Sequence, residues 1–247
     1  MLNLVESRRY WFILLVQTLV FFITPFAREH RPLFFLFLFG LFGILVAAIL
    51  TIWEARLPRL LAIGSAVAVL ATGLMASPSL RFEDPTVLWL SACTVSYALF
   101  ILIAIVSIGA DVLFRERVTL DCILGSICVY MFLGIFFAFV FGLFALLLPG
   151  SFNYGGEGGS PWAVTLNGLL YFSYSTLTTT GYGDITPARP FVRSVAVFES
   201  IAGTLYIALM ITRLVSLHAA DRGAGGLDAA AHRGAAIPEM RRRRRLL

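Results

Sequence analysis

Six long apolar runs constrain this chain more than any other feature of its sequence. They cover about residues 10–26, 33–53, 60–76, 86–109, 120–149 and 191–215. Their lengths are close to the roughly 20 residues that cross a bilayer as an α-helix. Because 59% of the residues are hydrophobic and only 13% are charged, a large soluble core is excluded. The sequence therefore predicts an all-α membrane protein with six transmembrane helices.

The positions of the arginines predict the topology. All 19 basic residues are arginine, and they lie mostly between and after the apolar runs. If the N-terminus is cytoplasmic, 14 of them lie inside and five lie outside, namely Arg28, Arg31, Arg81, Arg189 and Arg193. Since cytoplasmic loops are rich in basic residues, we expect a multi-pass protein of the plasma membrane with both termini inside and residues 150–190 outside. Topology explains these charges, so we expect no nucleic-acid partner.

The runs also divide the chain into domains. Residues 1–109 would form a peripheral four-helix domain, and residues 122–216 a second membrane domain. Between them, the linker 110–121 mixes charged and apolar residues, which would suit an interfacial helix or a plain loop.

The C-terminal segment, residues 217–247, is rich in Ala, Gly and Arg, a composition typical of a disordered cytoplasmic tail. Its last arginines could bind anionic lipid headgroups; they are Arg241, Arg242, Arg243, Arg244 and Arg245. The alternative is that they act only as a topology signal or a solubilising tail.

The segment between the fifth and sixth runs neither spans the membrane nor resembles an ordinary loop. Ser160 and Pro161 suit the N-cap and first turn of a helix. The apolar residues that follow are too few to cross the membrane and return. We therefore predict a re-entrant helix over 161–178 that enters the membrane from the outer side. Extended backbone is tolerated at that depth where it lines a water-filled path or is walled by protein. Residues 178–184 (TTTGYGD) should therefore line a path.

The residue types in this segment suit a dehydrated cation, whose hydration shell a ring of backbone carbonyls can replace. Successive carbonyls point to one axis only if the backbone alternates in handedness. Gly181 and Gly183 supply the left-handed positions. The hydroxyl of Thr179 can add a further oxygen ligand, and the carboxylate of Asp184 would raise the cation concentration at the outer mouth.

Tyr182 lies between the two glycines and should point away from the axis. We expect its ring to brace this segment against an aromatic residue of the re-entrant helix. The three partners that the sequence offers are Trp162, Tyr171 and Phe172.

Residues 179–184 (TTGYGD) resemble the selectivity filter of potassium channels, with Thr180 where valine is commoner. The resemblance covers about residues 160–216. It implies that K⁺ is bound by the carbonyls of Thr179, Thr180, Gly181 and Tyr182 and by the Thr179 hydroxyl, with no other cofactor. Because each chain has one such segment, four chains are needed for a closed ring, which predicts a homotetramer. We therefore expect a potassium-selective channel subunit that conducts K⁺ passively.

The sixth run, with the inner helix expected over 191–215, extends the resemblance. Gly203 lies where channels of this family often have a gating hinge; a glycine there permits bending or simply close packing. Four residues below it recur at helical spacing and would line the inner cavity and gate: Thr204, Ile207, Ile211 and Val215. The alternative is that this stripe packs on the fifth helix.

Glu199 is the only acid well inside an apolar run, and a carboxylate at that depth should face protein or water. We expect it to bond the back of the re-entrant helix at Ser173, Ser175 or Thr176. Such a bond could steady the filter or respond to pH, or it could be purely structural.

The fourth run contains no Arg or Lys. Voltage sensing requires several charges that cross the membrane field. We therefore expect the six-span layout without intrinsic voltage sensing.

No motif in the sequence indicates an enzyme. Two other classes share part of the pattern. A subunit of a potassium uptake transporter would carry related loops, and a non-conducting membrane sensor could have kept a channel-like pore. Ion flux in liposomes separates these alternatives from a channel.

Overall fold

The computed structural model describes residues 9–23, 64, 87–114, 119–154, 166–213 and 215–216. Nearly all of the second and third predicted runs, Trp162 and the tail at 217–247 lie outside these residues. The predictions for the arginines of the tail therefore stay predictions.

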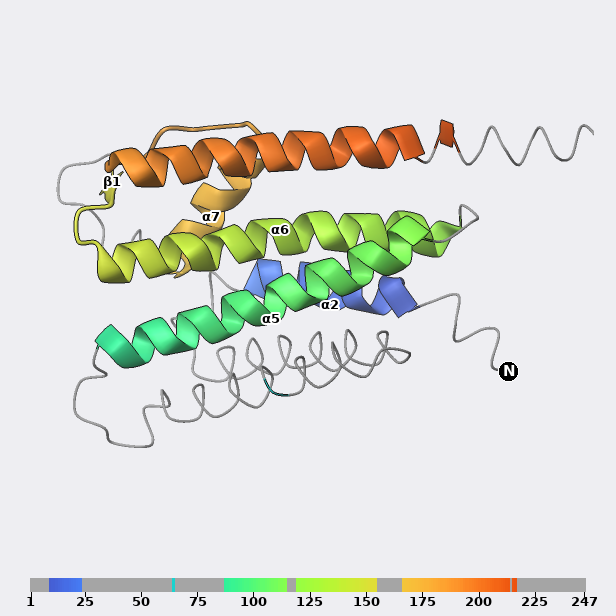
Figure 1. Cartoon of the computed structure of the whole chain (residues 1–247), viewed down its shortest axis with the longest axis horizontal. Helices are drawn as coiled ribbons and strands as arrows, with labels where there is room; N and C mark the ends of the chain where they lie inside the picture. Colours follow the sequence, from blue (N-terminus) through green and yellow to red (C-terminus); the bar gives the residue numbers. More distant parts are fainter. Residues whose placement is uncertain are drawn as a thin grey trace, which may run out of the picture.

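The structure is mostly helical, and its long helices run side by side (Figure 1). They are α2 (Arg9–Ile23), α5 (Val87–Phe114), α6 (Leu120–Leu147) and a C-terminal helix (Pro190–Arg213). Within the described residues, three helical stretches are long and apolar enough to cross a membrane; they are Leu90–Phe114, Leu120–Leu147 and Pro190–Arg213. The apolar stretch in α2 is shorter, Tyr10–Leu19.

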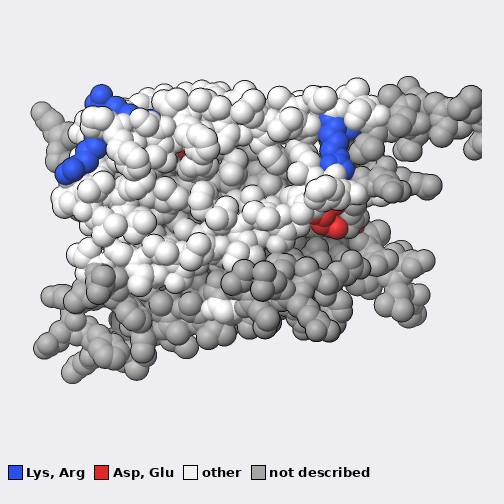
Figure 2. Space-filling view, in the orientation of Figure 1, with Lys and Arg blue, Asp and Glu red and all other residues white. Residues whose placement is uncertain are grey.

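The charged side chains visible in Figure 2 gather at the two ends of the bundle. A broad surface with almost no charge lies between them. This distribution is what a membrane protein needs, because the hydrocarbon core of the bilayer excludes charge.

The linker between α5 and α6 is shorter than residues 110–121. Residues 110–114 continue α5, and α6 begins at Leu120, so that residues 115–119 connect the two helices. On α5, Asp111 accepts a hydrogen bond from the hydroxyl of Tyr10, and the apolar side chain of Val112 is buried. Both side chains therefore have suitable surroundings when this stretch is helical. At the start of α6, Thr119 caps the helix by accepting a hydrogen bond from the Cys122 N–H at 3.3 Å.

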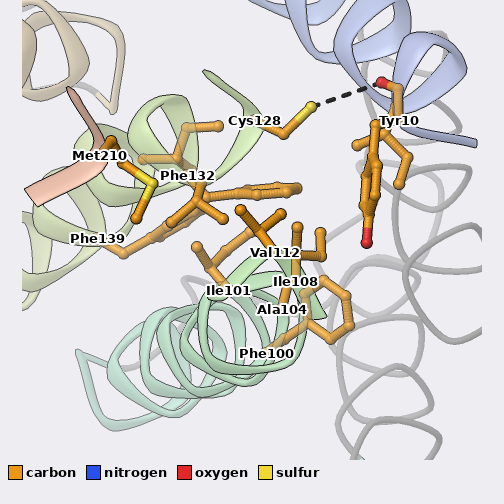
Figure 3. Packing of buried hydrophobic residues seen from close by; sticks show 13 residues of the cluster. Tyr10, Phe100, Ile101, Ala104, Ile108, Val112, Cys128, Phe132, Phe139 and Met210 are labelled. Atoms are coloured by element: carbon orange, nitrogen blue, oxygen red, sulfur yellow. Dashed lines mark hydrogen bonds between the residues drawn. The ribbon is translucent and has the colours of Figure 1, made fainter. Parts of the chain in front are cut away.

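α2 and α5 pack on α6 through one apolar cluster (Figure 3). Buried side chains of all three helices meet there; those labelled in Figure 3 include Tyr10, Phe100, Ile101, Ala104, Ile108, Val112, Cys128, Phe132 and Phe139. The Cys128 thiol donates a hydrogen bond to the Tyr10 carbonyl at 3.6 Å. The cluster holds α2 and α5 against α6.

On the other side of α6, a shorter helix α7 (Leu166–Leu177) lies between α6 and the C-terminal helix (Figure 1). The rings of Phe141 in α6 and Phe172 in α7 meet edge to face with centroids 5.0 Å apart. Such an arrangement is the preferred one for aromatic pairs and contributes beyond simple burial.

A two-stranded antiparallel sheet that the sequence pattern does not predict joins the loops at the end of the bundle near α7. It pairs β1 (Phe152–Tyr154) with β2 (Ile185–Pro187), in the register Phe152↔Pro187 and Tyr154↔Ile185. The segment that follows α6 is thereby tied to the segment that leads into the C-terminal helix.

Candidate functional site: the segment between α7 and the C-terminal helix

α7 is held against α6 by side chains that bond across the two helices. The Tyr174 hydroxyl donates to the Met131 carbonyl at 2.7 Å, and the Tyr130 hydroxyl donates to the Leu177 carbonyl at 3.3 Å. Gly134 leaves room for the Tyr174 ring, since a Cβ there would lie 2.6 Å from Tyr174 Cε1. These contacts fix how far α7 reaches along α6. The predicted re-entrant helix was 161–178, and residues 161–165 lie outside the described part.

The last turn of α7 passes directly into the segment Thr179–Asp184, called the filter segment below. Its first N–H groups donate back to α7: Thr179 to the Thr176 carbonyl at 3.0 Å, and Thr180 and Gly181 to the Ser175 carbonyl at 2.8 and 3.0 Å. By contrast, the carbonyls of residues 179–182 accept no hydrogen bond from any described residue. The donors are therefore used inside the protomer, and the acceptors are left available.

The backbone of the filter segment takes a positive φ at every second residue. The angle is 60° at Thr179, 56° at Gly181 and 83° at Gly183. The two glycines are where the sequence analysis placed the left-handed positions. Thr179 was missed, although the two-residue spacing of the glycines, continued backwards, leads to it.

The hydroxyl of Thr180 takes part in a hydrogen-bonded chain that a valine could not form. Thr178 Oγ1 donates to the Tyr174 carbonyl at 2.7 Å, and Thr180 Oγ1 lies 2.9 Å from Thr178 Oγ1. Because the single hydrogen of the Thr178 hydroxyl is already used, Thr180 is the donor of the second bond. Thr180 thus ties its own side chain to the end of α7.

Tyr182 stacks on Tyr171 of α7, with ring centroids 5.7 Å apart and an angle of 9° between the rings. Of the three partners expected for Tyr182, the structure brings Tyr171 to it, whereas Phe172 packs on Phe141. The outer end of the filter segment is therefore braced on α7.

The C-terminal helix presents one face to α6 and α7. Glu199, Gly203 and Met210 on this face are buried, and the Tyr206 hydroxyl donates to the Ser126 carbonyl of α6 at 2.8 Å. A Cβ on Gly203 would lie 2.7 Å from the Leu177 carbonyl oxygen. Gly203 therefore lets the helix approach the end of α7 closely, and its role as a hinge stays a prediction.

The four residues expected to line the cavity and gate lie on a different face. Thr204, Ile207, Ile211 and Val215 are all exposed in the protomer. The protomer does not bury this stripe against α6, and its role in a cavity or gate stays a prediction.

Glu199 lies behind α7, fully buried, with its Oε1 2.5 Å from Ser173 Oγ. Ser173 is one of the three partners expected for it. The other carboxyl oxygen, Oε2, is buried without a hydrogen-bond partner among the described residues.

Residues 126–219 match a family model described as an ion channel. The match covers most of α6, the whole of α7, the filter segment and the C-terminal helix. It supports an ion-channel domain in this part of the chain and, with it, passive ion conduction across a membrane. No curated protein and no solved structure matched the chain.

Proposed function

We propose that the chain is one subunit of a homotetrameric, potassium-selective channel that conducts K⁺ passively across the plasma membrane. The carbonyls of Thr179, Thr180, Gly181 and Tyr182 and the Thr179 hydroxyl bind the ion. One observation carries the proposal: positive φ angles alternate at Thr179, Gly181 and Gly183, while the N–H groups of residues 179–181 bond back to α7.

This backbone suits a cation that has lost its water. K⁺ prefers oxygen ligands, and a flexible ring of carbonyl dipoles can replace its hydration shell. Alternating handedness turns successive carbonyls to the same side of the strand. The C-terminal end of α7, which carries a partial negative charge, leads into the first ligand, Thr179, and adds to the attraction.

The exposure of the filter segment supports an assembly of several chains. Residues 178–184 are all exposed in the protomer, although the helices beside them are largely apolar. Extended backbone at this depth needs protein or a water-filled path around it. Four copies around one axis supply both, and they close the ring of ligands.

Reconstitution of the purified full-length protein tests the proposal. Liposomes loaded with K⁺ should release it down its gradient, Ba²⁺ should block the release, and replacement of K⁺ by Na⁺ should abolish the flux. Protein-free liposomes are the control. Equal fluxes of Na⁺ and K⁺, or a monomer in lipid, would contradict the proposal. A tetramer without flux would favour a membrane sensor, and uptake against the gradient would favour a transporter.

A further inference from the structure

Three helices meet at the hydroxyl group of Ser173. Its Oγ lies 2.7 Å from the Gly134 carbonyl oxygen of α6 and 2.5 Å from Glu199 Oε1 of the C-terminal helix. Ser173 itself belongs to α7, and all three residues are buried. A single hydroxyl thus joins the fifth predicted span, the re-entrant helix and the sixth predicted span.

The number of hydrogens at this junction determines where the proton of Glu199 is. A serine hydroxyl has one hydrogen, and a backbone carbonyl can only accept. When Ser173 donates to Gly134, the short contact between Ser173 Oγ and Glu199 Oε1 needs a second hydrogen. The carboxyl group of Glu199 is the group that can supply it.

The surroundings of Glu199 also disfavour a charge. It forms no ion pair with the described residues, and its Oε2 is unpartnered. The titratable groups facing it are Tyr130 of α6 and Tyr174 of α7, whose hydroxyl hydrogens already bond to backbone carbonyls. An isolated buried carboxylate is costly, and such groups generally take up a proton instead.

We propose that Glu199 keeps its proton and donates it in a hydrogen bond to Ser173, which in turn donates to Gly134. This neutral relay makes Glu199 a positioning residue for the filter segment. The inference rests on the proposed channel function for its physiological meaning, but the location of the proton does not depend on ion conduction.

The relay acts on the ion path through α7. Ser175, two residues after Ser173, provides the carbonyl that holds the N–H groups of Thr180 and Gly181. A shift of α7 along the other two helices would move these filter residues with it. When the proton is removed, Oε1 can only accept, and Ser173 must give up its bond to Gly134 to satisfy it.

Infrared spectroscopy of the tetramer in lipid tests the protonation directly. The difference spectrum between the wild type and Glu199→Gln at neutral pH should contain the carbonyl stretching band of a protonated carboxylic acid. Titration to alkaline pH should convert this band to carboxylate bands. Carboxylate bands alone at neutral pH would overturn the proposal.

Ion selectivity tests the positioning role. In Glu199→Gln the amide can donate to Ser173 in place of the acid, so K⁺ flux should stay at the wild-type level and should become independent of alkaline pH. Glu199→Leu and Ser173→Ala each break the relay, and the ratio of K⁺ to Na⁺ flux should fall about tenfold, as expected for one lost buried hydrogen bond.

Ser126→Ala is the matched control for Ser173→Ala, because Ser126 is also buried but bonds to Cys122 and Met210 instead. Its flux ratio should not change. Unchanged selectivity in Glu199→Leu would overturn the positioning role. A wild type that conducts K⁺ selectively but lacks the acid band would overturn this inference alone, whereas an acid band in a protein without K⁺ flux would overturn the channel function alone.

Discussion

Thr179 has a φ of 60°, which an L-residue adopts at a cost of roughly 1–2 kcal/mol. The bond from its N–H to the Thr176 carbonyl holds it in that conformation. Thr180 adds a side-chain bond to Thr178 at 2.9 Å, so both threonines couple the filter segment to the end of α7. At this scale, the proposed selectivity would depend on a few backbone angles and on the bonds that keep them.

Gly181→Ala tests the importance of these angles. Gly181 has a φ of 56° and Gly150 has a φ of 75°, and a Cβ at either position would meet no atom within 4 Å. Alanine should therefore strain both backbones by a similar amount, about 1–2 kcal/mol. We expect Gly181→Ala to lose selective K⁺ flux in liposomes and Gly150→Ala to keep it. Equal fluxes in the two variants would contradict the role of the filter segment.

Gly203→Ala tests the close contact at the end of α7. The new Cβ would lie 2.7 Å from the Leu177 carbonyl oxygen. We therefore expect overpacking to lower the free energy of unfolding by about 1–3 kcal/mol. Gly109 is a matched helical glycine at which an added Cβ would meet no atom within 4 Å. Gly109→Ala should be neutral or stabilising by up to about 1 kcal/mol. Thermal unfolding of the two variants in detergent measures this difference in stability. A Gly203→Ala protein as stable as the wild type would contradict the close contact between the C-terminal helix and the end of α7.

Residue types were enough to predict the positive φ of Gly181 and Gly183 and the burial of Glu199 against α7. Two glycines separated by one residue are typical of a backbone that alternates in handedness, and a lone acid in an apolar run must be buried against a polar partner. The choice among Ser173, Ser175 and Thr176 as the partner of Glu199 was not predictable. It depends on how α7 is rotated against the C-terminal helix, and helical spacing alone does not give the rotation of one helix relative to another.

Among the elements, α7 is the one that sets the position of the filter segment. It contacts α6 through Tyr174 and Gly134, and it contacts the C-terminal helix through Leu177 and Gly203. Its outer part packs aromatic rings on Phe141, and Tyr171 braces Tyr182. Because α7 is fixed on several sides, it can hold the filter segment, which has few backbone hydrogen bonds of its own.

The long helices were predictable because about 20 apolar residues in a row have one stable arrangement in a membrane. The paired strands β1 and β2 were not, since each has three residues, too few for an alternating pattern. The fourth apolar run is predicted to end at residue 109, but α5 continues to Phe114 and includes Asp111. Its bond with Tyr10, far away in sequence, keeps it in the helix.

α5 supports a prediction about gating. Between Val87 and Phe114 it has no Arg or Lys. One charge that crosses the field contributes only about 2.3 kcal/mol per 100 mV, so steep gating needs several. We expect a shallow conductance–voltage curve in planar bilayers without blocking ions. A steep curve under these conditions would show that the protein senses voltage by another route.

At the scale of the whole molecule, the proposed tetramer would share its bound ions among four chains. A ligand that binds only the assembled state stabilises it in proportion to the logarithm of its concentration. We therefore expect the tetramer to melt at a lower temperature in Na⁺ solution without K⁺ than in K⁺ solution. In Gly181→Ala the melting temperatures in the two solutions should be equal. Native mass spectrometry gives the number of chains, and a melting temperature independent of K⁺ would contradict shared ion sites.

The short connection between α5 and α6 has a consequence for how such a tetramer is built. From Phe114 to Leu120 the chain takes six steps between Cα atoms, which span at most about 22 Å when fully extended. Within the protomer α5 packs on its own α6, and so short a connection favours this pairing over one with the α6 of a neighbour. In the proposed tetramer each subunit would then form a self-contained sector of the ring, and a defect in α2 or α5 of one copy would weaken that quarter while leaving the remaining three intact.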